Sequence, residues 1–407
     1  MKTIIVGGGA AGCFAAIQAA RLGDSVTVIE RNDRIGRKLR ITGKGRCNLT
    51  NNCDRETLLA NIPHGGRFLY SAFATFSPQD VMAFFEDLGV ALKTERGNRV
   101  FPVSDQAAEI VETLHCEMQR LGVEIVQGRV DSLTGDPDGN CNGVRAGDMV
   151  CTGDRVILAT GGATYPLTGS EGDGYALVKA LGHTVTEIRP SLVPLETLER
   201  DCAEMMGVSL KNVTLTLKRD GKSVYTELGE MLFTHFGVSG PLVLSASAHM
   251  EQAGNYTLHI DLKPALTPEQ LDTRLQREIS AAPNKELPSL LRKLLPASMV
   301  MPMIGRCSIP ARVRGNSLTK GQRLRIVQEL KNFAFSVRRT RPIAEGIITR
   351  GGVSLKEVSP KTMESRIVPG LYIIGELLDC DAYTGGFNLQ IAWSTAYAAA
   401  HAAENRT

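Results

Sequence analysis

Hydrophobic and polar positions at the start of the chain follow the order strand, helix, strand. Residues 2–6 form a short continuous apolar run, which is typical of a strand buried on both faces. Residues 10–22 are mostly small or helix-forming, and residues 25–29 form a second apolar run. This order predicts a strand–helix–strand unit that belongs to a parallel sheet.

The middle of the chain changes from a strand period to a helical period. Three stretches alternate as strands do: 212–218, 231–236 and 256–262. They predict an antiparallel barrel that begins near Pro190. Leucines at helical spacing then indicate a small helical unit at 267–328, and residues 330–338 are expected to return to the barrel.

Three glycines between the first strand and the first helix have the spacing of a nucleotide-binding turn. Gly7 permits a tight turn, Gly9 lets the backbone approach a pyrophosphate, and Gly12 allows close helix–strand packing. The helix start offers unpaired N–H groups to phosphates. Glu30, at the end of the second strand, is placed to accept from a ribose hydroxyl and would repel a 2′-phosphate. The unit therefore favours FAD or NAD over NADP.

The segment after Glu30 favours FAD over NAD. Residues 31–51 are rich in glycine, arginine and lysine, which suits an extended loop that runs along a phosphate-containing ligand. An NAD-binding unit normally continues to its next helix without such a loop. The alternative is an ordinary solvated basic loop.

Two later apolar runs, 156–163 and 370–376, are predicted to be further strands of the nucleotide-binding sheet. Just after the second run, three acids are candidates to bind ribityl hydroxyls: Glu376, Asp379 and Asp381.

A predicted helix at 387–403 begins after the pair Gly385–Gly386. The backbone N–H groups of Gly386, Asn388 and Leu389 would stabilise negative charge at the pyrimidine edge of a reduced flavin. A plain glycine-capped helix start is the alternative.

Four long segments, in this order, resemble the HI0933-like family of FAD-dependent oxidoreductases, the YhiN/BaiN group: GRKLRITGKGRCNLTN, VILATGGATYPLTGSEGDGYALVKALGH, GEMLFTHFGVSGPLVLSAS and TRGGVSLKEVSPKTMESRIVPGLYIIGELLDCDAYTGGFNLQIAWSTAYAAA. The resemblance covers nearly the whole chain. One departure is Lys44 between Gly43 and Gly45, where relatives often have three small residues.

The resemblance implies an α/β fold with a two-dinucleotide-binding, Rossmann-like FAD domain that is split in sequence. We expect that domain at 1–189 and 346–407, a β-barrel-like domain at 190–266 and 329–345, and a helical insert at 267–328. The residues expected to contact FAD are Gly7, Gly9, Ala10, Ala11, Gly12, Glu30, Arg31, Lys38, Gly43, Arg46, Asn48, Val130, Thr160, Gly161, Gly375, Glu376, Asp379, Gly386, Asn388 and Leu389.

Composition adds few constraints. The formal charge of +3 neither demands nor excludes a polyanionic partner, and the nine dispersed cysteines favour reduced thiols in the cytoplasm over disulfides or a metal site. We expect Cys47 and Cys53 to be buried and inert rather than a dithiol relay. Polar residues interrupt the apolar C-terminal stretch, which predicts a buried helix and no membrane span. Residues 287–328 contain eight Lys and Arg and no acid, which indicates a solvated face or an anion-binding surface.

These patterns predict an FAD-dependent oxidoreductase that passes hydride from a transient NAD(P)H donor to a small organic molecule. The family resemblance implies that this molecule is a conjugated enone of the 3-oxo bile-acid or steroid type. A flavin-dependent RNA-modifying enzyme, motivated by the basic insert, is one alternative, although nucleic acid is the less favoured partner. A non-catalytic flavin-binding regulator is the other. Arg46, Asn48 and Tyr383 could donate to a substrate carbonyl, but simple cofactor contact is the preferred role. The sequence assigns neither a catalytic residue nor an oligomeric state.

Overall fold

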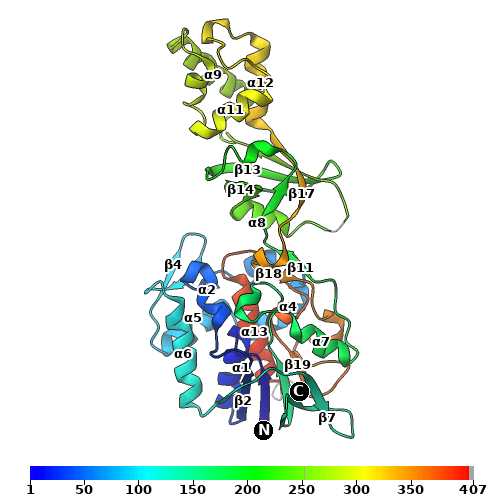
Figure 1. Ribbon diagram of the computed structural model, residues 1–407. Helices are drawn as coiled ribbons and strands as arrows, with labels where there is room; N and C mark the ends of the chain where they lie inside the picture. The colour runs from blue at the N-terminus through cyan, green and yellow to red at the C-terminus, as the bar shows by residue number, and fades with distance from the viewer. Residues whose placement is uncertain (252, 403–407) are drawn as a thin grey trace. The chain divides into compact units, whose positions relative to one another are not determined.

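The computed structural model describes residues 1–251 and 253–402, and the chain divides into two units (Figure 1). The first unit is made of Met1–Ser191 and Ile343–Thr407, and the second is Leu192–Pro342. The first unit is therefore discontinuous in sequence, and the second is inserted into it.

The core of the first unit is a five-stranded parallel sheet in the order β19-β10-β1-β2-β6. Its strands are β1 (Lys2–Val6), β2 (Ser25–Glu30), β6 (Glu124–Gln127), β10 (Arg155–Leu158) and β19 (Leu371–Ile373). Helix α1 (Ala10–Arg21) connects β1 to β2 and packs against both. The predicted strand–helix–strand unit and the predicted α/β fold are confirmed, because a continuous apolar strand can be buried on both faces only in a covered sheet.

Helix α13 (Phe387–Ala400) packs along α1 (Figure 1). Phe14 of α1 and Trp393 of α13 meet edge to face, with ring centroids 5.6 Å apart, and both side chains are fully buried. The predicted C-terminal helix is confirmed, but it ends at Ala400 with His401 as its C-cap; the predicted end, Ala403, lies outside the described residues. Among the residues that the structure describes, no helix is long and apolar enough to cross a membrane.

Smaller elements surround the central sheet. The helices are α2 (Arg37–Gly45), α3 (Arg55–Ala60), α4 (Gly66–Thr75), α5 (Pro78–Asp87), α6 (Ala107–Arg120) and α7 (Asp173–Ala180). The strands are β3 (Thr50–Asn51), β4 (Leu92–Glu95), β5 (Arg99–Pro102), β7 (Ser132–Gly135), β8 (Cys141–Ala146), β9 (Met149–Thr152), β11 (Arg189–Ser191) and β18 (Ile348–Arg350).

The expectation of a wholly extended basic loop after β2 was wrong. Helix α2 occupies part of that segment, and its regular geometry breaks at Thr42, where ψ is 149°. Gly43 and Lys44 then adopt left-handed conformations, with φ of 58° and 61°. Positive φ is costly for lysine, so the turn after α2 is strained at Lys44 and relaxed at its glycines.

The second unit contains a closed six-stranded barrel in the order β12-β15-β14-β13-β16-β17. The barrel strands are β12 (Leu195–Thr197), β13 (Ser209–Arg219), β14 (Lys222–Thr234), β15 (Gly237–Ser239), β16 (Tyr256–Asp261) and β17 (Phe333–Thr340). Phe233, Phe333 and Phe335 form an aromatic cluster in its core. The expected barrel-like fold is confirmed, and the structure shows that the barrel is closed.

Five helices belong to this second unit: α8 (Pro241–Ser247), α9 (Pro268–Ala281), α10 (Leu287–Leu291), α11 (Ala297–Arg306) and α12 (Lys320–Lys331). Helices α9 and α12 each begin with a capping box, in which the hydroxyls of Thr267 and Thr319 accept from backbone N–H groups of the first turn. The helices carry the buried leucines whose spacing predicted a helical unit, including Leu271, Leu275 and Leu291.

A buried ion pair ties α13 to the central sheet. Arg155 on β10 donates to the Asp24 carboxylate at 2.8 Å and to the carbonyls of Ala399 and Ala400 at 3.0 and 3.1 Å. Thr3 also donates to Asp24, at 2.6 Å. Burial by itself would raise the pKa of Asp24, but the Thr3 hydroxyl and the Arg155 guanidinium outweigh it and lower that pKa below 3.8.

We expect Asp24→Asn to reduce the free energy of unfolding by about 1–3 kcal/mol at neutral pH, because Arg155 loses its buried counter-charge. A carboxyl with a lowered folded-state pKa stabilises the fold above its unfolded pKa of 3.8, and loses that contribution as the pH falls through the folded value. The difference between variant and wild type should therefore shrink in urea titrations below that pH. Asp33→Asn, at an exposed position, is the control and should change little.

Candidate functional site

The carboxyl ends of β1, β2 and β10 border a cavity of about 240 Å³ in the first unit. The first turn of α1, the start of α2 and the first turn of α13 complete its wall. The residues that were expected to contact a cofactor and that line this cavity are Gly7, Gly9, Ala10, Ala11, Glu30, Arg31, Lys38, Val130, Thr160, Gly161, Gly375, Glu376, Asn388 and Leu389. The structure thus brings together residues that are nearly 400 positions apart in sequence.

The glycine turn has the close contacts that its spacing predicts. Gly7 has a φ of 103°, and a side chain there would meet the Ala159 carbonyl oxygen at 2.6 Å. A Cβ on Gly12 would lie 1.9 Å from the Gly7 oxygen, whereas a Cβ on Gly9 would have nothing within 4 Å. Gly9 is the N-cap of α1, and no side chain caps the helix. The unpaired N–H groups of the first turn are therefore available to an anion in the cavity.

Glu30 holds the loop that surrounds the α1 end of the cavity. Its side chain is almost wholly buried and accepts from the Gly8 N–H at 2.7 Å and from the backbone and side chain of Asn32 at 2.8 and 2.6 Å. A carboxylate has about four lone-pair positions, so Glu30 can still accept from a ribose hydroxyl. Arg31 is turned towards Asp173 at the start of α7, at 2.8 Å.

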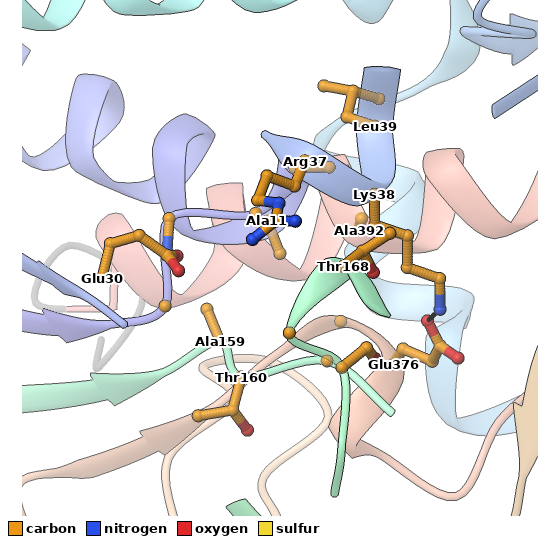
Figure 2. A pocket seen from close by; sticks show the side chains of 18 of the residues that line it. Ala11, Glu30, Arg37, Lys38, Leu39, Ala159, Thr160, Thr168, Glu376 and Ala392 are labelled. Atoms are coloured by element: carbon orange, nitrogen blue, oxygen red, sulfur yellow. Dashed lines mark hydrogen bonds and ion pairs between the residues drawn. The ribbon is translucent and has the colours of Figure 1, made fainter. Parts of the chain in front are cut away.

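Lys38 and Glu376 form an ion pair on the cavity wall, with Nζ 2.7 Å from Oε2 (Figure 2). The Thr164 hydroxyl lies 2.8 Å from the same ammonium, and Thr349 donates to the other Glu376 oxygen through its N–H and its hydroxyl, both at 2.9 Å. These contacts orient both charged groups. One ammonium hydrogen of Lys38 remains for an anionic ligand, because lysine has three donors. In Figure 2 this pair and Glu30 lie on opposite sides of the cavity.

The N-terminus of α13 forms the other end of the cavity. Its N-cap, Gly386, has a φ of 99° and no side-chain cap, and Asn388 and Leu389 in the first turn line the cavity. The Asn388 amide accepts from the Ala382 N–H at 2.9 Å and donates to the Ala382 carbonyl at 2.7 Å. With its amide assigned to satisfy both neighbours, Asn48 accepts from the Gly386 N–H at 3.0 Å. The positive end of the helix dipole is thus held at the cavity.

Several expected site residues do not line the cavity: Gly12, Gly43, Arg46, Asn48, Asp379 and Gly386. Gly12 follows the lining residue Ala11 in sequence, and Gly386 is two positions before the lining residue Asn388. Asn48 accepts from the Gly386 N–H. The Arg46 guanidinium instead pairs with Glu95 and Asp105 and lies 4.1 Å from the centre of the Phe101 ring. Their contact with a cofactor stays a prediction. Asp381, a third candidate for the ribityl group, turns its carboxylate to His64 and Ser191.

Sequence patterns missed other lining residues, among them Asn32, Arg37, Arg129, Thr168, Gly169 and Ser170. Arg37 is in the basic segment after β2, and its guanidinium donates to the Asn32 side chain at 2.9 Å. The basic composition was a signal for Arg37, but it did not single out one residue among the seven Lys and Arg of that segment. The Thr168–Ser170 turn has no periodic signal, because only the folded loop after β10 brings it to the cavity.

Three buried thiols near the cavity are held neutral. Cys380 lines the cavity, and its pKa is raised by burial and by the nearby carboxylates of Asp381, Asp379 and Glu376. Burial raises the pKa of Cys47 to about 12 and that of Cys53, near Asp54, to about 11. None of these three is suited to act as a thiolate nucleophile.

The residues present fit FAD as the cofactor. Glu30 would hold the ribose of the adenosine, and the first turn of α1, with Arg37, would hold the phosphates. The Asn388 and Leu389 N–H groups would face the pyrimidine edge of the flavin. The open space beside Gly9 is where the fingerprint requires a pyrophosphate to approach the backbone.

We expect Gly9→Ala and Gly12→Ala to separate cofactor contact from packing. The methyl group of Gly9→Ala projects into open space, so the apoprotein should keep its melting temperature while FAD binds at least about tenfold more weakly, as for one lost close contact. Gly12→Ala should lower both stability and FAD content, because its methyl group would overlap the Gly7 oxygen. Thermal unfolding of apoprotein and flavin fluorescence titration are the measurements. A normal FAD affinity in Gly9→Ala would contradict this placement of the phosphates.

Comparisons with known proteins identify the family of the chain. The sequence profile of the HI0933-like protein Rossmann domain matches residues 1–402. The chain is 34% identical to the 3-dehydro-bile acid delta(4,6)-reductase of Clostridium scindens, over 99% of this chain and 98% of that protein. It is also 34% identical to the ribosomal RNA dihydrouridine synthase of Haemophilus influenzae, over 98% of this chain and 97% of that protein.

Among solved structures, the 3-ketosteroid delta1-dehydrogenase of Sterolibacterium denitrificans has a TM-score of 0.52 and 14% identity, with 98% of each chain covered. At that identity the likeness concerns the fold alone. The profile match over nearly the whole length and the two full-length relatives establish the family. The chain belongs to the HI0933-like family and is an FAD-dependent oxidoreductase.

Proposed function

We propose that the protein passes hydride from NAD(P)H, through bound FAD, to a C=C bond that is conjugated to a carbonyl group in a small organic molecule. The observation that carries this proposal is the full-length similarity to a 3-dehydro-bile acid delta(4,6)-reductase. In such a molecule the Δ4 double bond is next to the 3-oxo group, so it forms an enone. Hydride addition to the carbon β to the carbonyl is the reaction that this arrangement favours.

The chain's own residues support hydride transfer at the α13 end of the cavity. FAD, when bound, supplies the two-electron redox chemistry. The N–H groups at the start of α13 point a positive dipole end at this region, and the Lys38 ammonium adds a nearby cation. Both stabilise negative charge that develops in the cavity during reduction.

NAD(P)H is proposed as a transient donor. Among residues 1–251 and 253–402, one cavity is lined by the glycine turn and the start of α1, and we assign FAD to that cavity. A nicotinamide cofactor would therefore visit the exposed face of the flavin rather than occupy a nucleotide domain of its own.

RNA modification is the second candidate function, and two observations favour it. One relative is a ribosomal RNA dihydrouridine synthase, and the uracil C5=C6 bond is also conjugated to a carbonyl, so the two relatives need similar chemistry. In addition, residues 192–342 contain 21 Lys and Arg against 14 Asp and Glu, whereas the whole chain has 46 against 43. The second unit thus carries the excess positive charge, which suits a polyanionic partner.

Three exposed arginines in the helical part of this unit are the best candidates for RNA contact: Arg312, Arg314 and Arg325. Backbone pairing of Arg314 with Glu286 also brings it beside the exposed Lys285. Arg323 is a poor candidate, because it forms an ion pair with Asp272 at 2.5 Å. Arg306 is engaged in the same way with Asp201.

For the leading function, we expect anaerobic NADH or NADPH to bleach the flavin absorbance of the purified protein. Cyclohex-2-en-1-one or androst-4-ene-3,17-dione should then restore it, with formation of the saturated ketone. Mass spectrometry of the product is the check. Flavin that no nicotinamide donor reduces and no enone reoxidises would contradict the proposal and leave the non-catalytic regulator.

The second function predicts binding of ribosomal RNA fragments that weakens steeply with salt. The variant R312Q/R314Q/R325Q should then lower affinity at least about tenfold, since each lost phosphate contact removes part of the counterion-release term. The control K211Q/K218Q/K222Q removes the same charge from the β13–β14 hairpin. Absence of binding at low salt in a filter assay, or equal losses in both variants, would count against RNA as the substrate.

A further inference from the structure

Three side chains form a hydrogen-bonded chain at one edge of the first unit. The Asp381 carboxylate lies 2.8 Å from His64 Nδ1, and its other oxygen accepts from the Ser191 hydroxyl at 2.6 Å. Asp381 and Ser191 have no exposed surface, whereas the His64 side chain is 27% exposed. The chain of contacts therefore runs from solvent at His64 to a buried serine.

Charge makes the histidine the essential partner. A buried carboxylate is costly unless it is paired with a positive group. Among the ion pairs of the described residues, His64 is the one partner of Asp381 that can carry positive charge. Asp381 therefore orients the ring, with its carboxylate as the partner of Nδ1. That leaves Nε2 as the atom that can release a proton.

The pair lies immediately behind the cavity wall at its α13 end. Cys380, next to Asp381, lines the cavity, and a Cβ on Gly65, next to His64, would lie 2.7 Å from Cys380 Cβ. Ser191 pairs in the β11–β18 register with Ile348, which also lines the cavity. Only glycine allows this close approach, so the loop before α4 is held against the wall.

Solvent reaches the other side of the pair. Pro63 and Gly65, on either side of His64, line an open groove between α3 and α4, together with Leu59, Phe68 and Leu355. A proton that His64 releases can therefore be replaced from water. Among the described residues no hydrogen-bond partner is found for His64 Nε2.

We propose that His64, held in place by Asp381, supplies the proton that completes reduction of the C=C bond. This inference rests on the proposed enone reduction. Hydride adds to the β-carbon, and the electron pair of the C=C bond moves towards the carbonyl oxygen. The α-carbon then takes a proton from His64 Nε2, and solvent reprotonates the ring. The two electrons come from NAD(P)H, and the product is the saturated ketone.

Other groups on the cavity wall are less suited to this role. Lys38 and Glu376 are paired with each other, and burial raises the pKa of the Cys380 thiol. Tyr175 does not line the cavity, and burial and nearby acids raise its pKa.

The test is anaerobic stopped-flow spectroscopy of the full chain with FAD, in two separate half-reactions. We expect His64→Gln and Asp381→Asn to leave flavin reduction by NADH unchanged, and to slow reoxidation by androst-4-ene-3,17-dione or cyclohex-2-en-1-one at least about 100-fold, as for loss of a general acid. Reoxidation by the wild type should be slower in D2O than in H2O, because a proton is transferred when the C=C bond is reduced. His115→Gln, on α6, is the matched control and should behave as the wild type.

Each outcome decides the question. A His64→Gln variant that reoxidises within threefold of the wild type overturns the role of His64 but leaves the proposed function intact. Wild-type flavin that neither enone reoxidises overturns the proposed function, and this inference with it. If both variants fail to retain FAD, the solvent isotope effect of the wild type decides, since equal reoxidation rates in D2O and H2O overturn the proposal.

Discussion

The site depends on one close approach of two backbone segments, at which residues 48–51 hold the N-terminus of α13. Gly386 lies so near this segment that a Cβ there would be 2.3 Å from the Thr50 carbonyl carbon. Asn51 donates to the Gly385 carbonyl at 3.0 Å, and the Trp393 indole donates to the Leu49 carbonyl at 2.9 Å. The carbonyls of Gly385 and Leu49 thus have side-chain partners. A helix start that is fixed from both sides can point its N–H groups into the cavity without relying on a side-chain cap.

This constraint extends to the rest of the α13 end of the cavity. Asn388 in the first turn of α13 fixes Ala382, and the adjacent Asp381 reaches His64 and Ser191. The loop before α4, the strand β11 and the start of α13 are therefore connected through side-chain hydrogen bonds. Since these groups are preorganised, little reorganisation is needed when charge develops during reduction. At the opposite end, Glu30 connects the glycine turn to the loop after β2 in the same manner.

The local parts of the site could be predicted from the sequence, and the parts made by distant contacts could not. Gly7, Gly9 and Glu30 follow from spacing within one strand–helix–strand unit, and the barrel-like fold follows from alternation along its strands. Arg46 was expected to contact the cofactor because it is in the basic segment, but its guanidinium pairs with Glu95 at the end of β4 and with Asp105 after β5. Spacing carries no information on such competing partners. Likewise, nothing in the sequence paired His64 with Asp381, because 317 positions separate them.

The family establishes the cofactor more firmly than the substrate, and the chemistry of the two relatives gives a reason. A bile-acid enone and a uracil base both contain a C=C bond conjugated to a carbonyl, so one flavin site can serve both reductions. The molecules differ in size and charge, and the cavity residues that would contact FAD cannot distinguish them. Groups outside that cavity must therefore select between the two substrates. The excess positive charge of residues 192–342 is the clearest feature of this chain that would favour RNA. If residues 192–342 bind no RNA, RNA is excluded as the substrate. A small molecule with an enone is then the remaining substrate class with the same chemistry.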